Sequence, residues 1–151
     1  MRRRLSPTER FVWAAGEALP VNFALVARIR GRTTPNLLCE ALSAARRRHP
    51  LLGARIGDPG RWQAWLTTRG TPEPQLRVVR ATAGSRGASA DGDEGAQGAG
   101  GAEGWTRVLE EELQRRFDTE AGPLARFVMV DHGDAFDLVA IYHHLVAVVH
   151  H

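Results

Sequence analysis

The feature of the sequence that most restricts the fold is an apolar run near its end, residues 137–149, which contains the adjacent histidines His143 and His144. Its length and its β-branched residues indicate a buried strand. Because successive side chains of a strand point to opposite faces, one imidazole is expected in the core and the other toward a cleft. We interpret His143 as the packed ring and His144 as the functional candidate, since a neutral imidazole with a pKa near ~6.5 can accept a proton from a hydroxyl or an amine.

Hydrophobic spacing along the rest of the chain switches between the helical and the strand period. Helices are expected over residues 7–18, 34–49 and 105–117, and strands over residues 21–30, 51–56, 61–67, 76–79, 124–131 and 136–144. The third strand is expected to return on the second through a turn at Asp58-Pro59-Gly60. The last two strands are expected to form a hairpin around His132-Gly133-Asp134.

The first helix has a strong start signal in Ser6-Pro7-Thr8-Glu9. This segment places an N-cap residue before proline at the first helical position and an acid at the third. Cys39, the only cysteine, excludes an internal disulfide and fits a reducing compartment. Its place within the second helical pattern predicts a core residue.

Residues 81–104 consist almost wholly of Gly, Ala, Ser, Asp, Glu and Gln, with no large apolar side chain. Such a segment cannot bury enough surface to offset its ordering entropy, so we expect a flexible low-complexity insertion in a single domain spanning residues 1–151. The segment contains no GxGxxG pattern, and the whole chain has no lysine for a phosphate-binding P-loop.

The net charge of +3 and the pI of about 10.3 raise the question of nucleic-acid binding. The arginines are spread along the chain among nearly as many acids, without a basic stripe interleaved with aromatic residues. We therefore expect no nucleic-acid partner. No apolar run reaches the about 18 residues of a membrane span, and the sequence predicts a cytoplasmic protein.

Four segments, in this order, carry a family resemblance. Ser6 and Trp13 occupy the serine and aromatic positions of an opening helix motif, and residues 48–52 resemble a helix end followed by a strand. Residues 117–126 match the pattern FDxxxGPLxR at its own spacing, and residues 143–147 match the first five positions of HHxxxDG. The chain resembles the N-terminal half of the condensation-domain and polyketide-associated acyltransferase group, which has the chloramphenicol acetyltransferase-like fold.

The resemblance implies an α+β fold: a mixed, largely antiparallel sheet with helices packed on it. It also implies acyl transfer, with His144 as general base toward an acceptor hydroxyl or amine and His143 in a supporting position. The acyl group would come from a thioester of coenzyme A or of the phosphopantetheine on an acyl carrier protein. No bound cofactor and no metal are implied; a metal site formed by His143, His144, His150 and His151 is a weaker alternative, because adjacent histidines on a strand diverge.

The sequence departs from the family where HHxxxDG has Asp-Gly, because Val148-Val149 stand there. Two β-branched residues favour continued strand. The family enzymes also continue into a second half that forms the other wall of the substrate channel. We therefore expect little or no acyltransferase activity from this chain alone, and an apolar surface that docks a second half or self-associates. The alternative is a non-catalytic half-domain that docks a partner subunit or a carrier protein.

Overall fold

The computed structural model describes residues 1–58, 63–81 and 99–148. The elements are β1 (Arg2–Arg4), α1 (Pro7–Ala18), β2 (Asn22–Arg30), α2 (Pro35–Arg48), the 3-10 helix η1 (Pro50–Gly53), β3 (Arg55–Gly57), β4 (Trp65–Thr67), β5 (Leu76–Arg80), α3 (Ala99–Gln114), β6 (Ala125–Asp131), β7 (Ala135–His143) and α4 (Leu145–Val148). None of the described helices is long and apolar enough to cross a membrane.

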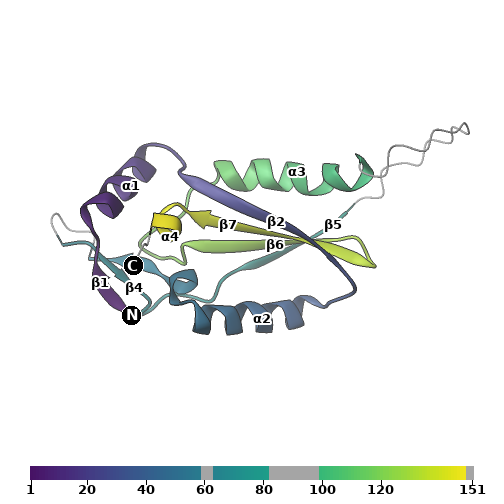
Figure 1. Ribbon diagram of the computed structural model, residues 1–151, viewed down its shortest axis with the longest axis horizontal. Helices are drawn as coiled ribbons and strands as arrows, with labels where there is room; N and C mark the ends of the chain where they lie inside the picture. Colours follow the sequence, from purple (N-terminus) through teal and green to yellow (C-terminus); the bar gives the residue numbers. More distant parts are fainter. Residues whose placement is uncertain (59–62, 82–98, 149–151) are drawn as a thin grey trace, which may run out of the picture.

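The larger sheet has the strand order β2-β7-β6-β5. β2 pairs antiparallel with β7 and β7 antiparallel with β6, while β5 and β6 are parallel. Helices α3 and α2 lie on opposite faces of this sheet (Figure 1). The predicted α+β class, with a mixed and largely antiparallel sheet and packed helices, is confirmed.

The α3 face of the larger sheet is a closed core. Val108 of α3 packs against a row of fully buried residues on β6 and β7: Val128, Val130, Val139 and Ile141. On the opposite face, Leu38 of α2 packs against Met129 and Phe136. The two faces therefore alternate along each strand, as the side-chain period of two requires.

Helix α2 leaves the outermost strand of its face uncovered. The cross-strand pairs Leu25↔Ala140, Ala27↔Leu138 and Ile29↔Phe136 place alternate residues of β2 on the α2 face. Leu25 is nevertheless 62% exposed and Ile29 38% exposed. We call this row of Phe23, Leu25, Ala27 and Ile29 on the edge strand the open face.

A smaller sheet, in the order β1-β4-β3, closes the structure beside α1. Its inner face carries Ile56 and Leu66, which form a core cluster with Leu124 and with Leu145 of α4. The short segment after the two histidines is thus anchored on this small sheet. Helix α1 contacts α4 from the other side.

Helix α1 begins and ends where its sequence predicts. The Ser6 hydroxyl accepts the backbone N–H of Glu9 at 3.2 Å, and the Glu9 carboxylate accepts the N–H of Ser6 at 2.7 Å. This reciprocal capping box satisfies two helix N-terminal donors. Arg3 also donates to the Glu9 carboxylate, at 2.6 and 2.9 Å.

Several predicted elements need correction. The expected strand at 51–56 begins as η1, because Pro50 suits the first position of a helix and has no N–H to give to a strand ladder. Strand β1 was not predicted, since three consecutive arginines show no apolar alternation. Cys39 is exposed rather than in the core, because Leu38 takes the buried position of α2.

The boundaries around the low-complexity segment also shift. Helix α3 begins at Ala99 and ends at Gln114, so the predicted insertion at 81–104 extends too far and the predicted helix at 105–117 starts and ends too late. Ala81 is still tied to the sheet through its N–H, which donates to the Asp131 carbonyl at 2.9 Å. The remaining part, residues 82–98, lies outside the described residues, as do Pro59 to Trp62 of the predicted hairpin.

Candidate functional site

His143, the last residue of β7, is buried, with 3% of its surface exposed. Its Nδ1 accepts the backbone N–H of Leu145 at 3.2 Å, and its ring lies edge-on to that of Phe117, with centroids 6.1 Å apart. Burial, and to a lesser extent the charge of His144, lowers the pKa of His143 to about 4. The ring is therefore neutral at physiological pH, and an Nδ1 that accepts a hydrogen bond places the proton on Nε2.

Gly16 of α1 makes room for the His143 ring. A Cβ at Gly16 would lie 2.8 Å from His143 Nε2 and 2.9 Å from Val21 Cγ2, closer than such atoms pack. A helix interior normally favours alanine over glycine by about 1 kcal/mol, so the glycine here serves the packing of the ring. Helix α1 therefore packs closely against the His143 ring.

His144 follows the end of β7 and is exposed. Its backbone N–H donates to the Val21 carbonyl at 2.9 Å, and its ring lies edge-on to Phe23 of the open face, 5.9 Å between centroids. Within the described part of the chain, its ring has no hydrogen-bond partner. The prediction that one histidine is packed and the other faces outward agrees with the burial of His143 and the exposure of His144.

The segment after His144 does not continue as a strand, contrary to the expectation from its valines. The chain turns at His144, and α4 covers Leu145–Val148. The physical reason is that Leu145 is drawn into the small-sheet core, where it is 1% exposed. Val148 therefore lies in a helix, and Val149 lies outside the described residues.

The FDxxxGPLxR segment is a structural turn between α3 and β6. The Asp118 carboxylate accepts the N–H groups of Glu120 and Ala121 at 3.1 and 2.9 Å, and the Asp118 carbonyl accepts the N–H of Gly122 at 2.8 Å. Gly122 has φ +65°, and a Cβ there would lie 2.7 Å from Arg55 Cβ. Only glycine adopts this positive φ without strain and has no Cβ to collide with Arg55.

Arg126, the last position of that pattern, ties β6 to the end of α3. Its guanidinium donates to Glu112 Oε2 and the Glu112 carbonyl at 2.5 Å each, and to the Arg115 carbonyl at 2.6 Å. The same group stacks on Phe117, 4.1 Å from the ring centroid. Because Phe117 contacts His143 in turn, Arg126 supports His143 through one aromatic ring.

Glu112 is the partner that sequence reasoning missed. It is 2% exposed although it carries a charge, and it follows the buried Val108 by one helical turn. An acid on the apolar stripe of a helix is a signal for a buried ion pair, and this signal was available in the sequence. Burial, which outweighs the attraction of Glu112, lowers the pKa of Arg126.

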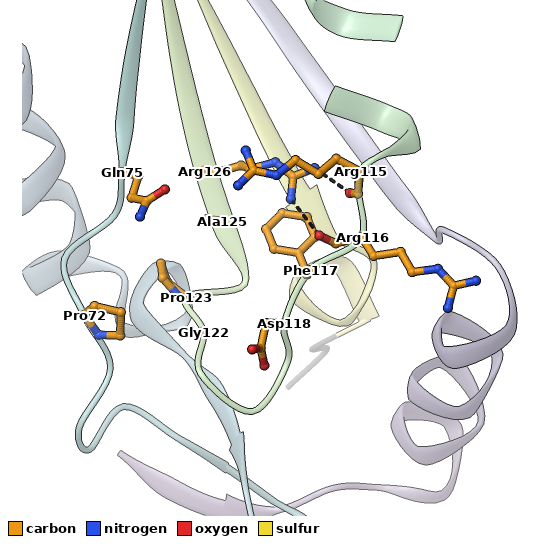
Figure 2. A pocket seen from close by; sticks show the side chains of 10 residues that line it. All are labelled: Pro72, Gln75, Arg115, Arg116, Phe117, Asp118, Gly122, Pro123, Ala125 and Arg126. Carbon is orange, nitrogen blue, oxygen red and sulfur yellow. Dashed lines mark hydrogen bonds between the residues drawn. The ribbon is translucent and has the colours of Figure 1, made fainter. Parts of the chain in front are cut away.

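A cavity of about 210 Å³ opens beside this turn. Figure 2 shows Arg126 and Phe117 on one side of it and Pro123 and Gln75 on the other. His143 and His144 are not among its lining residues. The cavity therefore belongs to the turn and not to the histidine pair.

The described residues contain no group of three or more His, Cys, Asp or Glu side chains that could hold a metal ion. Of the four histidines in the alternative metal set, His150 and His151 lie outside the described residues. His143 uses Nδ1 for an internal hydrogen bond and is packed against Gly16 at Nε2. Its ring is thus not open to a ligand.

No protein-family model and no curated protein matches this sequence. Solved structures do match. The starter condensation domain of rhizomide synthetase RzmA has 20% identity and a TM-score of 0.72, over 96% of this chain and 33% of that chain. A mutant of that domain in complex with C8-CoA has 19% identity and a TM-score of 0.71, over 96% and 31% of the two chains.

The four-domain nonribosomal peptide synthetase holo-AB3403, bound to AMP and glycine, has 16% identity and a TM-score of 0.66, over 97% of this chain and 11% of that chain. The chain therefore has the fold of a condensation-domain part, and it spans about a third of the length of the RzmA structures that it matches. The predicted resemblance to the N-terminal half of a condensation domain is confirmed at the level of the fold.

Proposed function

We propose that this chain is the N-terminal part of a condensation-type acyltransferase, a single subdomain in which His144 is the general base. The observation that carries the proposal is an exposed imidazole beside the open apolar face, with its neighbour His143 neutral and immobilised. An acceptor hydroxyl or amine would give its proton to His144 while it attacks the thioester carbonyl. The C–S bond then breaks, and the leaving thiolate takes that proton from His144. A positioned base of this kind contributes about 10²- to 10⁴-fold in rate.

The donor in this proposal is an acyl-CoA or an acyl-phosphopantetheine on a carrier protein. The complex of an RzmA domain with C8-CoA supports a thioester donor for this fold. The chain supplies apolar side chains along the open face, which suit an acyl chain or the second wall of a channel. No bound cofactor or metal is needed for this step, and a cytoplasmic location accords with the lone, unpaired Cys39.

We further propose that the chain alone has little activity, because His144 and the open face are exposed and no other described residue covers them. The test is to join the chain to the remaining part of a condensation domain such as that of RzmA and to measure acyl transfer from octanoyl-CoA to an amine. His144→Ala should reduce the rate by about 10²-fold or more, whereas His49→Ala, at the exposed end of α2, should not. Equal rates for both variants, or efficient transfer by the chain alone, would contradict the proposal.

A second candidate is a non-catalytic half-domain that docks a partner subunit or carrier protein. Val148 in place of the family aspartate, together with the open face, favours it. Leu25→Asp should reduce binding of a hydrophobic dye and any self-association, because it places a charge in the open face. Leu19→Asp is the matched control, since Leu19 is 69% exposed at the end of α1, outside the open face. This candidate is favoured if the joined protein shows no acyl transfer while the chain binds a partner that Leu25→Asp releases.

A further inference from the structure

The outer face of the small sheet gathers arginines around a tryptophan. The register Arg2↔Thr67↔Arg55 aligns one row of side chains, and Arg4↔Trp65↔Gly57 aligns the next. Because directly paired residues project to the same side of a sheet, both rows share one face. The inner face of the same strands carries the core residues Ile56 and Leu66, so the arginine rows face away from the core.

A cavity of about 260 Å³ lies on this outer face. The described residues that line it are three arginines, one acid and three others: Arg2, Arg55, Gly57, Asp58, Trp65, Thr67 and Arg69. Three guanidinium groups against one carboxylate leave a net positive charge. The volume is below the about 300–1,000 Å³ typical of sites for drug-sized ligands, so it suits a small anion or the charged end of a larger molecule.

One arginine of the cavity, Arg55, is held in place by backbone groups. Arg55 donates from Nε to the Arg69 carbonyl at 2.8 Å and from Nη1 to the Glu120 carbonyl at 3.1 Å. Both acceptors are neutral, so the described residues provide Arg55 with no carboxylate partner. An ordered guanidinium whose charge is not paired is a site for an anion.

The aromatic ring and the one acid among the described lining residues add to this arrangement. Arg2 and Arg4 stack on Trp65, with their guanidinium carbons 4.4 and 5.3 Å from the ring. Asp58 reaches Arg2 at 3.6 Å across an exposed pair, and its backbone has φ +50°, which non-glycine residues seldom adopt. An exposed pair of this kind contributes at most about 1 kcal/mol in free energy, which an incoming anion of higher charge can displace.

We propose that this face binds the phosphate group of a small phosphate compound between Arg2, Arg55 and Arg69, beside Trp65. A phosphate offers several oxygens and up to two negative charges to these guanidinium forks, whereas Asp58 offers Arg2 one carboxylate. The site is separate from His144, because the core of the small sheet lies between the cavity and the segment that begins at Leu145.

The test is a titration of the isotope-labelled chain with inorganic phosphate, AMP and adenosine, followed by the NMR signals of the Arg55 Nε–H and the Trp65 indole N–H. Phosphate and AMP should shift both signals in a saturable way that weakens with added salt, and adenosine should not. If only AMP acts, the ligand is a phosphate ester; if both act equally, the site reads the phosphate alone. If neither phosphate nor AMP saturates the signals at about 10 mM, well above a 1 mM dissociation constant, the proposal is overturned.

Charge variants separate a site from general attraction to a basic protein. Arg69→Gln leaves every Arg55 hydrogen bond in place, because Arg55 contacts the carbonyl of residue 69, and it should weaken binding about two- to five-fold. Asp58→Asn should strengthen binding by a similar factor, and asparagine tolerates the positive φ. Arg32→Gln, an exposed arginine outside the cavity, is the matched control. Equal effects of Arg69→Gln and Arg32→Gln, or no gain with Asp58→Asn, would refute the proposed site.

Discussion

The bond between Arg126 and the end of α3 allows a quantitative test. Arg126→Met keeps much of the aliphatic stem over Phe117 but removes the charge and the donors. It leaves Glu112, only 2% exposed, without its closest cation. Removing one partner of a buried ion pair costs about 3–5 kcal/mol in free energy of unfolding.

The structure places this variant at the lower end of that range. Arg77 still reaches Glu112 at 3.3 Å, but its side chain is 49% exposed and compensates only in part. We therefore expect a loss of about 3 kcal/mol. Because the total stability of a domain is about 5–15 kcal/mol, the variant should remain folded but melt at a lower temperature.

Urea unfolding followed by circular dichroism measures the effect. With a slope of about 2 kcal/mol per M, the midpoint should fall by about 1.5 M. In Arg126→Met/Glu112→Met both charges are removed together, so the loss should shrink to about 1–2 kcal/mol, the cost of the uncapped carbonyls. Arg107→Met is the control, since Arg107 is 85% exposed in its ion pair with Glu111. A double variant at least as unstable as Arg126→Met would refute a buried ion pair as the source of the effect.

Three further predictions concern pH and glycine. The Arg3 guanidinium lowers the pKa of Glu9 from 4.5 to about 2. The ionised Glu9 therefore stabilises the fold fully above pH 4.5, and this contribution is lost as the pH falls toward 2. Glu9→Gln should flatten this part of a plot of Tm against pH. The pKa of His143 is lowered from 6.5 to about 4 in the folded protein. As the pH falls, the unfolded chain is therefore protonated at this residue before the folded one, and the free energy of unfolding should decrease from pH 6.5 toward 4. His143→Gln should remove this decrease. Gly122→Ala and Gly133→Ala each put alanine at a positive φ, which costs about 1–2 kcal/mol in free energy. Only the Cβ at residue 122 also collides with Arg55, so Gly122→Ala should lower the Tm much more than Gly133→Ala. Equal decreases in Tm would contradict this account.

The sequence predicted the elements that depend on neighbouring residues. The bounds of α1 follow from Ser6, Pro7 and Glu9, which interact within one helical turn. The β6–β7 hairpin follows from two apolar runs around Gly133, whose φ is +92°. The burial of His143 follows from strand alternation, because it continues the row of Val139 and Ile141 on β7.

Other features were hidden because their partners are distant in the sequence. Whether Leu145 continues a strand depends on a core supplied by Ile56 and Leu66, and the arginine cavity joins Arg2, Arg55 and Arg69 only after the small sheet has formed. Pairing of β1 with β4 gives Arg2–Arg4 a strand conformation that their own pattern does not indicate. These features thus depend on contacts between residues far apart in the sequence, which the local spacing of apolar residues does not reveal.

The parallel pairing of β5 and β6 has a practical consequence. Because these strands run the same way, the chain leaves β5 at Arg80 on the sheet end where β6 finishes, while His143 terminates β7 at the opposite end. The low-complexity segment joins the structure after Ala81, at the end remote from the histidine pair. Each doubling of such a connection costs only about 0.6 kcal/mol in closure entropy. Affinity tags, fluorescent reporters or new chain termini introduced there should therefore leave the histidine end of the sheet unchanged.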